Sequence, residues 1–187
     1  MNTTHSSLLL RLRTREDSDA WSRFVKLYTP LVHCWVSRLI ADKNQVEDLV
    51  QDVFVVLLSK IPEFGMRPPD RFRAWLRTVT LNKCRDWIRK KGRKTEPALL
   101  EKIESAIADP NQLLTDLEYR QFLAQSALQL MRDAFSDTTW RACWEHVARG
   151  RSAQEVSQEL GISENAVYLA RGRVLKRLRI ELEGLWD

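Results

Sequence analysis

A predicted helix from Ser163 to Leu178 carries amide, aromatic and cationic side chains at spacings that suit contact with duplex DNA. Val167 and Val174 would face a core on this helix, so the residues between them face outward or sideways. A helix fits the major groove, where an amide reaches base edges, cations neutralise phosphates and the helix start favours an anion. A helical hairpin with a merely solvated basic face is the alternative. The candidates for duplex contact are Ser163, Asn165, Tyr168, Leu169, Arg171, Arg173 and Lys176.

The residues just before this helix have the pattern of a helix-turn-helix. Ser152 and Glu155, three residues apart, predict a capping box for a first helix over 153–160. Gly161 supplies a left-handed stop, and Ser163 caps the second helix. In DNA-binding proteins with this motif the first helix braces the second in the major groove.

A second group of side chains, on the helix predicted from about Arg71 to Lys91, mixes flat rings with cations and an amide. Unpaired bases need such surfaces, because rings stack on base faces while cations follow the phosphates. Taken alone, the simpler interpretation is that the rings form a bundle core and the charges a solvated face. The residues concerned are Phe72, Arg73, Trp75, Arg77, Asn82, Lys83, Arg85, Trp87, Arg89 and Lys90.

Acidic side chains gather at the start of the preceding helix, where Glu47, Asp48 and Asp52 accompany Gln51. Carboxylates near a helix N-terminus interact favourably with the helix dipole, and this alone accounts for them. They would serve equally well as a docking surface for a basic helix of a partner. Sequence chemistry does not choose between the two.

The sequence contains no motif for catalysis, a metal or a cofactor. It has no Gly-rich phosphate loop, no HExxH and no GxSxG. No CxxC spacing occurs among the cysteines, which we expect to pack as small apolar residues. We therefore expect a protein that is not an enzyme and that needs no cofactor or metal. The isolated histidines and cysteines are His5, His33, His146, Cys34, Cys84 and Cys143.

The elements that must position these side chains are predicted to be helices. Apolar residues at spacings of three and four indicate a helix over about 21–39, which Pro30 would kink or divide in two. Asn44 and Glu47 indicate a capping box for the next helix, which Pro62 would end. No segment alternates with period two over the length of a strand. The expected fold class is all-α.

Composition divides the chain into two small helical domains and a linker. Residues 6–94 form a helical bundle, 95–117 a flexible acidic linker with local helix, and 118–187 a domain that contains the helix-turn-helix. The 30 Lys and Arg exceed the 25 Asp and Glu by only five, so the position of the charges matters more than their sum. No apolar run is long enough for a signal peptide or a membrane span, so we expect a cytoplasmic protein.

Taken together, these residues resemble a divergent subgroup of the extracytoplasmic-function sigma factors, within the sigma-70 family. The segment Phe24 to Phe64, which contains VEDLVQDVF, and the segment Phe72 to Lys91, which begins FRAWL, are similar to the sigma-two domain of these proteins. The segment Phe135 to Leu182 resembles their sigma-four domain. The pairing of VEDLVQDVF with FRAWL is specific, whereas the helix-turn-helix alone would not be.

The resemblance implies a subunit that directs bacterial RNA polymerase to promoters. The acidic helix would bind clamp helices of the largest polymerase subunit through Glu47, Asp48, Leu49, Gln51, Asp52 and Phe54. The loop 63–71 and the helix after it would melt the −10 element and hold a flipped base, and the linker would run towards the RNA exit path. The Ser163 to Lys176 helix would read the −35 element as duplex. The −10 role falls on Phe64, Arg73, Trp75, Arg77, Asn82, Lys83 and Asp86.

The reading helix departs from the common family pattern. Where family members often have Thr, Lys, Ser and Arg, this chain has Ala166, Tyr168, Leu169 and Ala170, so the promoter sequence is open. The implied partners are promoter DNA and core RNA polymerase, and control by an anti-sigma factor is left open. One alternative function is a helix-turn-helix regulator that binds an operator as a dimer without joining polymerase. Another is a helical adaptor, which would have no salt-dependent affinity for DNA.

Overall fold

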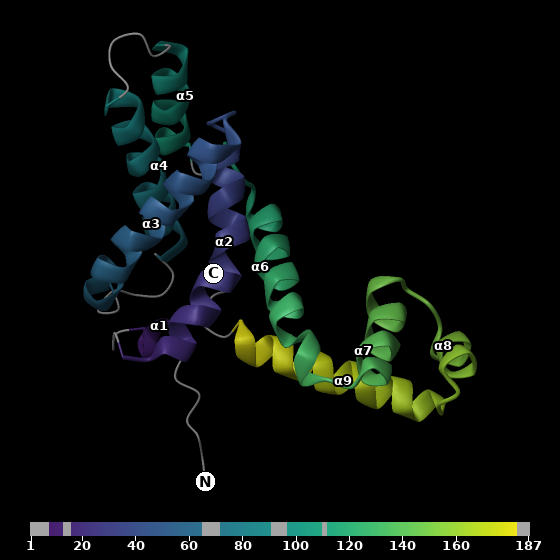
Figure 1. Ribbon diagram of the computed structural model, residues 1–187. Helices are drawn as coiled ribbons and strands as arrows, with labels where there is room; N and C mark the ends of the chain where they lie inside the picture. Colours follow the sequence, from purple (N-terminus) through teal and green to yellow (C-terminus); the bar gives the residue numbers. More distant parts are fainter. Residues whose placement is uncertain (1–7, 13–15, 65–71, 91–96, 110–111, 183–187) are drawn as a thin grey trace. The chain divides into compact units, whose positions relative to one another are not determined.

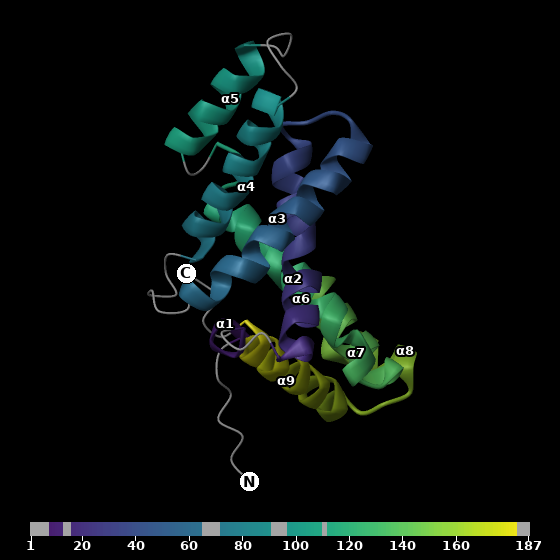
Figure 2. The ribbon, with the colours of Figure 1, turned by 60° about the vertical axis from the view of Figure 1, so that its left-hand side comes forward.

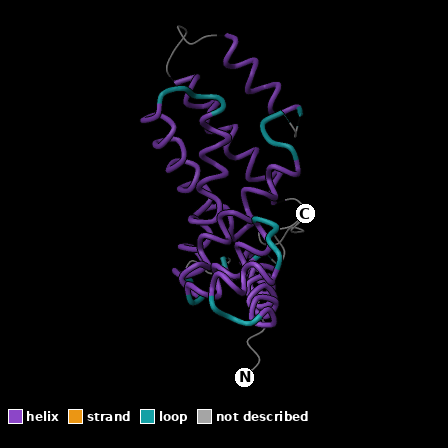
Figure 3. Tube along the Cα trace, turned by 90° about the vertical axis from the view of Figure 1, so that its right-hand side faces the viewer, coloured by secondary structure: helices purple, strands orange, loops and turns teal. Residues whose placement is uncertain are grey.

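The computed structural model describes residues 8–12, 16–64, 72–90, 97–109 and 112–182, apart from the side chain of Glu63. Over these residues the chain forms helices joined by short loops, and the trace in Figure 3 contains no strand within them. The expected all-α fold is confirmed. The chain divides into two compact units between Ser126 and Ala127.

The first unit is a helical bundle in which α2, α3 and α4 share one core. α2 contacts both α3 and α4, α3 contacts α4, and α5 packs along α4 (Figure 1, Figure 2). The short α1 contacts α2. The helices are α1 Leu8–Arg11, α2 Ser18–Ser37, α3 Lys43–Phe64, α4 Phe72–Lys90, α5 Pro97–Ala108 and the first part of α6 Asp116–Met131.

Aromatic rings form the centre of this core. Phe24 and Tyr28 of α2 are fully buried, with ring centroids 4.8 Å apart. Phe72, the first residue of α4, meets these two rings edge-on at 6.0 and 5.4 Å, and Phe54 of α3 meets Phe24 at 6.0 Å. Such pairs contribute about 0.5–1.5 kcal/mol each beyond the area they bury. The core therefore fixes the start of α4, the helix that carries the predicted base-contacting residues.

α2 runs through Pro30 as one helix, so of the two outcomes expected there, a kink or a division, the division into two helices is wrong. A proline in a helix interior removes one hydrogen bond and crowds the preceding turn, at a cost of about 3 kcal/mol. Pro30 itself is exposed, whereas Tyr28, Leu31 and Val32 around it are fully buried. Burial on both sides of the proline offsets its local cost.

The start of α3 also differs from the prediction. The expected capping box of Asn44 and Glu47 is wrong, because the helix begins at Lys43. The carboxylate of Asp42 instead accepts hydrogen bonds from the backbone N–H groups of Asn44, at 2.9 Å, and Gln45, at 3.4 Å. Asp and Asn are equally good cap residues, and the carboxylate one step earlier prevails.

The end of α3 lies beyond the proline that was expected to stop it. Pro62 is inside the helix, which continues to Phe64. Ile61 and Phe64, on either side of Pro62, are both buried in the bundle. The prediction of a helix end at Pro62 is therefore wrong, and burial of the last turn accounts for the difference.

The acidic segment after α4 contains a helix that belongs to the first unit. α5 packs against α4 and buries Ile103 and Ala106. Leu113 and Leu114, which precede α6, are also buried, at 3% and 1% exposure. The local helix expected in the linker is thus present. The predicted domain boundary at residue 117 stays a prediction, and the two compact units of the structure divide between Ser126 and Ala127.

The second unit is a small helical domain with two adjoining clusters of buried side chains. Figure 1 shows α7 and α8 packed on the long α9. One cluster comprises Ala142, Ala153, Val156, Val167 and Ala170, and the other comprises Met131, Cys143 and Val174. The elements are the end of α6, a 3-10 turn Arg132–Ala134, α7 Asp137–Cys143, a π-helical turn Trp144–Ala148, α8 Ala153–Leu160 and α9 Glu164–Glu181.

The predicted helix-turn-helix is confirmed in its local detail. Ser152 and Glu155 form the expected capping box, in which each side chain bonds to the backbone of the other. Gly161 ends α8 with φ 63° in the left-handed region, and Ser163 caps α9 by accepting a bond from the N–H of Ala166 at 3.2 Å. These local interactions fix the angle at which α9 leaves the turn.

Candidate nucleic-acid interface

α9 has one buried face and one face that is open to solvent. Val167, Ala170 and Val174 are buried, at 0%, 4% and 1% exposure, against α7 and α8. The opposite face follows at helical spacing and consists of exposed residues. This face carries Asn165, Leu169, Gly172 and Lys176, with Tyr168 and Arg173 to its sides.

The predicted duplex-contacting residues are all exposed. Ser163 lies at the N-cap of α9, where its side chain is already bonded to the Ala166 N–H. Arg173 and Lys176 form no ion pair with any residue that the structure describes. In contrast, Arg177 of the same helix pairs with Glu181 at 2.8 Å. The exposed set is Ser163, Asn165, Tyr168, Leu169, Arg171, Arg173 and Lys176.

The four departures from the family pattern fall in different places. Ala170 is buried and Ala166 is half-buried, so these two serve the packing of α9. Tyr168 and Leu169 are half exposed, at 51% and 50%, among the largest exposures of apolar side chains in the described chain. The open face of α9 is therefore partly apolar.

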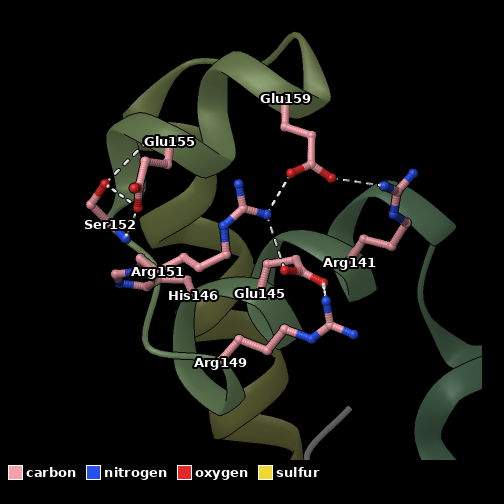
Figure 4. A network of polar contacts seen from close by, with 8 residues as sticks. All are labelled: Arg141, Glu145, His146, Arg149, Arg151, Ser152, Glu155 and Glu159. Atoms are coloured by element: carbon pink, nitrogen blue, oxygen red, sulfur yellow. Dashed lines mark hydrogen bonds and ion pairs between the residues drawn. The ribbon is translucent and has the colours of Figure 1, made fainter.

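A network of charged residues that was not expected from the sequence holds α8 to the turn that precedes it (Figure 4). Arg151 donates to Glu145 at 3.1 Å and also to Glu159 of α8. Arg141 of α7 pairs with Glu159 at 3.2 Å, and Arg149 pairs with Glu145 at 3.2 Å. The alternation of Arg and Glu every four residues from Arg141 to Arg149 was the signal that could have revealed it.

The charges of this network shift its titration. The hydrogen bond from Arg151 and the nearby positive charges hold the pKa of Glu159 below its ordinary value, and the same bond to Glu159 raises the pKa of Arg151. The backbone N–H and hydroxyl of Ser152 lower the pKa of Glu155 in the capping box. The carboxylates of Glu155 and Glu159 in α8 thus stay ionised at neutral pH.

His146 connects the segment before α8 to α9. Its Nδ1–H donates to the backbone oxygen of Arg151 at 2.7 Å, and its ring meets the ring of Tyr168 edge-on at 5.6 Å. His146 was expected to be an isolated core or surface residue, and it is half-buried. The contact fixes one side of the Tyr168 ring, and the residue as a whole is 51% exposed.

The cations at the start of α4 already have partners within the chain. Arg73 donates to the backbone oxygen of Leu114 at 3.0 Å, pairs with Asp116 and lies over the ring of Tyr119. Arg77 is buried, at 8% exposure, and donates to the backbone oxygen of Asp109 at 3.0 Å. Burial, and next the charge of Arg73, lowers the pKa of Arg77.

The aromatic residues of the predicted −10 site form a stack. Trp75 lies against Phe64, with ring centroids 4.5 Å apart and planes at 24°, and Phe72 is 5.6 Å from Trp75. Phe64 is 4% exposed, whereas Trp75 is only half-buried. Trp75 is therefore the ring of this cluster that solvent reaches. Residues 65–71, most of the loop expected to hold a flipped base, lie outside the described residues.

The remaining candidates on α4 occur further along its length. The side-chain oxygen of Asn82 accepts a bond from Arg85 at 2.8 Å, and Lys83 pairs with Asp52 of α3 at 3.6 Å. Asp86 is exposed. Asn82 and Lys83 are half-buried, so part of each side chain is open for contact beyond its partner.

The predicted polymerase-contacting residues separate into two faces of α3. Glu47, Asp48, Gln51 and Asp52 are exposed, whereas Leu49 and Phe54 are buried, at 2% and 9% exposure. The two buried side chains therefore support the helix from inside the bundle.

The exposed acidic face continues into two apolar side chains that were not predicted. Val55 and Leu58 are 65% and 47% exposed and follow Asp48, Gln51 and Asp52 at helical spacing. Most residues of that size lie in the core here, so the pair is unusual. The sequence signal was the continuous run VFVVLL, which has apolar residues on more sides of the helix than one core can cover.

Comparison with known proteins agrees with this arrangement. Residues 24–94 match the family model described as Sigma-70 region 2. The chain is 26% identical to a probable RNA polymerase sigma factor, RfaY, of Xanthomonas campestris over 172 residues, which are 90% of this chain and 42% of that protein. It is 26% identical to the ECF RNA polymerase sigma factor SigE of Mycolicibacterium smegmatis, over 82% of this chain and 59% of that protein.

A third relative is the ECF RNA polymerase sigma factor SigX of Bacillus subtilis, 27% identical over 78% of this chain and 74% of that protein. The chain thus spans about half the length of the first two relatives. Residues 24–94 thus resemble Sigma-70 region 2, and the relatives to which the chain is similar include RNA polymerase sigma factors of the ECF type. No described helix has the length and apolar character that crossing a membrane requires.

Proposed function

We propose that this chain is an alternative sigma factor, which binds core RNA polymerase and directs it to a specific set of promoters. The observation that carries the proposal is the presence, in one chain, of a region 2 bundle and a separate helix-turn-helix unit whose second helix has an open, cation-bearing face. Duplex recognition and strand separation require different surfaces, and the two units supply one each.

The second unit would bind duplex DNA through α9. Arg171, Arg173 and Lys176 are exposed and would contact phosphates, while Asn165 at the first turn would reach a base edge. The ion-pair network around Arg151 would hold α8 in place against α7 and the π-helical turn, and the first helix of such a motif braces the second in the major groove.

The first unit would bind the unpaired strand along α4. Trp75 offers a partly open ring for base stacking, which is worth about 1–3 kcal/mol per base. Asn82 and Lys83 lie two turns further along α4 and would contact the same strand. Unstacking a base costs a few kcal/mol, so stacking and phosphate contacts together would offset most of it.

The exposed face of α3 would be the docking surface for polymerase. Asp48 and Asp52 provide negative charge, and Val55 and Leu58 provide apolar area on the same face. A basic amphipathic helix is the partner that fits this combination, because cations meet the carboxylates while its apolar stripe covers the two side chains. The helix dipole alone does not account for the apolar pair.

Co-elution with core RNA polymerase that lacks any sigma subunit tests the proposal. We expect the chain to elute with core enzyme on gel filtration, and the variant Asp48→Ala with Asp52→Ala to elute largely as free protein. The matched control is Glu101→Ala with Glu104→Ala, which removes two exposed carboxylates from α5 and should leave the complex intact. A folded chain that binds DNA by itself and never joins core enzyme would instead favour the regulator that acts without polymerase.

A further inference from the structure

Gly172 occupies a position that the fold does not explain. It lies in the interior of α9, and a Cβ built at this position would meet no atom within 4 Å. Gly150 and Gly161, by contrast, have φ of 68° and 63°, in the left-handed region that their turns require. A helix with glycine at an interior position is less stable than one with alanine there. Gly172 therefore destabilises α9, and no close packing around its Cα requires a glycine.

The position of Gly172 on the helix indicates what it is for. It lies on the open face of α9, in line with Asn165, Leu169 and Lys176 and opposite the buried Val167. Where a glycine has no role inside the protein, the absent side chain allows another molecule to approach the helix backbone closely. The open face of α9 is therefore shaped for contact along the line through Leu169 and Gly172.

The charges around this line identify the class of the approaching molecule. Arg171 and Arg173 flank Gly172 in the sequence, Lys176 lies one turn further along the open face, and all three are exposed. Cations at these positions suit a polyanion and not an apolar protein surface. Leu169 lies one turn before Gly172 and is half exposed. An apolar side chain therefore lies among the cations on the surface that would face the polyanion.

We propose that Gly172 is the point at which α9 comes closest to duplex DNA, and that Leu169 beside it recognises the methyl group of a thymine in the major groove. The C5 methyl of thymine is the apolar group that base pairs present in this groove, and apolar side chains read it by contact. The proposal rests on the function proposed above and specifies how the same helix chooses its sequence.

Tyr168 supports this surface from one side. Its ring is held edge-on by His146, whose Nδ1–H is bonded to the backbone oxygen of Arg151 at 2.7 Å. His146 therefore acts as a positioning residue for Tyr168. The variant His146→Ala tests this role. It should broaden the base preference at the base pair beside Tyr168, which is next to the thymine opposite Leu169, and leave the preference for that thymine unchanged.

The first experiment uses Gly172→Ala in the whole 187-residue chain, bound to core polymerase. The probe is a duplex enriched by this holoenzyme from a randomised pool. The variant should be more stable, with Tm raised by about 2–4 °C, because alanine favours the helix and meets open space. Its affinity for the duplex should nevertheless fall about tenfold, and Gly172→Leu should lose more. Binding equal to that of the unchanged protein would overturn the proposal.

The second experiment removes one methyl group from the DNA. Replacing each thymine of the enriched duplex by uracil in turn should lower affinity about fourfold at one position, the value expected for one buried methyl. Leu169→Ala should bind the thymine and uracil duplexes equally well, whereas Tyr168→Ala should still distinguish them. If uracil is tolerated at every position, Leu169 does not read a methyl group.

The two proposals fail in different ways. If the chain does not join core polymerase, the proposed function fails, and a duplex enriched from the same randomised pool by the free chain still measures the effect of Gly172→Ala. If the holoenzyme forms and initiates but Gly172→Ala and the uracil duplexes have no effect, the contact surface proposed here is wrong and the function stands.

Discussion

The guanidinium of Arg73 lies 4.5 Å above the centre of the Tyr119 ring, while its N–H groups bond to the backbone oxygen of Leu114 and to Asp116. These partners are more than forty residues away in the sequence, and all lie in or beside the first turn of α6. A cation expected to contact the −10 strand is thus held by the acidic segment that follows α5. To bind DNA, Arg73 must exchange these partners for phosphates.

Asp116→Asn should therefore raise the affinity of the free protein for single-stranded DNA. The carboxylate side chain is 74% exposed, and ion pairs of this kind are worth about 0.2–1 kcal/mol, so the gain should be at most about fivefold. The measurement is a titration of a fluorescent oligonucleotide at fixed ionic strength. The control is Glu101→Gln on α5, which removes one negative charge at a site distant from Arg73 in the sequence. An equal gain in affinity for this control would mean that the effect comes from net charge alone.

Trp75→Ala should weaken binding of the unpaired strand by about 1–3 kcal/mol while leaving duplex binding unchanged. The ring is half-buried and stacks on Phe64, so its loss also removes packing. Trp75→Phe keeps a ring for stacking and should retain most of the binding. Permanganate footprinting of the open complex and a duplex-binding assay separate the two effects. Equal losses in both assays, matched by a lower Tm, would mean that Trp75 serves packing only.

The carboxylates that cap and brace α8 predict a loss of stability in acid. The pKa of Glu155 is lowered by the backbone and hydroxyl of Ser152, and that of Glu159 by Arg151. A pKa lowered in the folded state stabilises the protein fully above the ordinary carboxyl pKa of about 4.3, and the effect is lost as pH falls through the folded value. Urea midpoints between about pH 6 and 3 should fall accordingly.

Glu155→Gln and Glu159→Gln should flatten this dependence on pH, because the variants have no carboxylate to protonate at these positions. Glu164→Gln, which removes an exposed carboxylate at the start of α9, is the matched control and should leave the slope unchanged. Parallel curves for all three variants would show that the bracing carboxylates do not link stability to pH.

The cysteines should react with thiol reagents in a fixed order. Cys84 is fully buried in α4, and burial raises its pKa to about 12, so little thiolate forms near neutral pH. Cys34 is half-buried, and burial raises its pKa as well. We expect Cys34 to be labelled first and Cys84 only as the first unit unfolds, as followed by mass spectrometry. Labelling of Cys84 in the native protein at the rate of Cys34 would contradict this.

The parts of the structure that depend on neighbours in sequence could be predicted. The capping box of Ser152 with Glu155 and the glycine turn at Gly161 are set by three or four adjacent residues, and both are present. The prolines show the limit of this reasoning. Pro30 and Pro62 have strong local preferences against helix interiors, yet burial of side chains on both sides keeps α2 and α3 continuous.

The partners of the site residues could not be predicted, because they come from distant parts of the chain. Nothing local to Arg73 indicates that it meets Tyr119, and nothing local to Arg77 indicates its bond to Asp109. The exposed state of the predicted duplex-contacting residues followed from the helical period alone. Their roles, like those of the residues assigned to the −10 strand and to polymerase, stay predictions until they are tested.

Promoter-specific initiation in a purified system tests the central claim most directly. Core polymerase would be incubated with fragmented genomic DNA from the source organism, with and without the chain, and the 5′ ends of the transcripts sequenced. We predict that the chain concentrates initiation at a small set of positions that share two upstream sequence elements. Transcripts whose ends are distributed as with core polymerase alone, from a chain that is folded and bound to DNA, would contradict the assignment as a sigma factor.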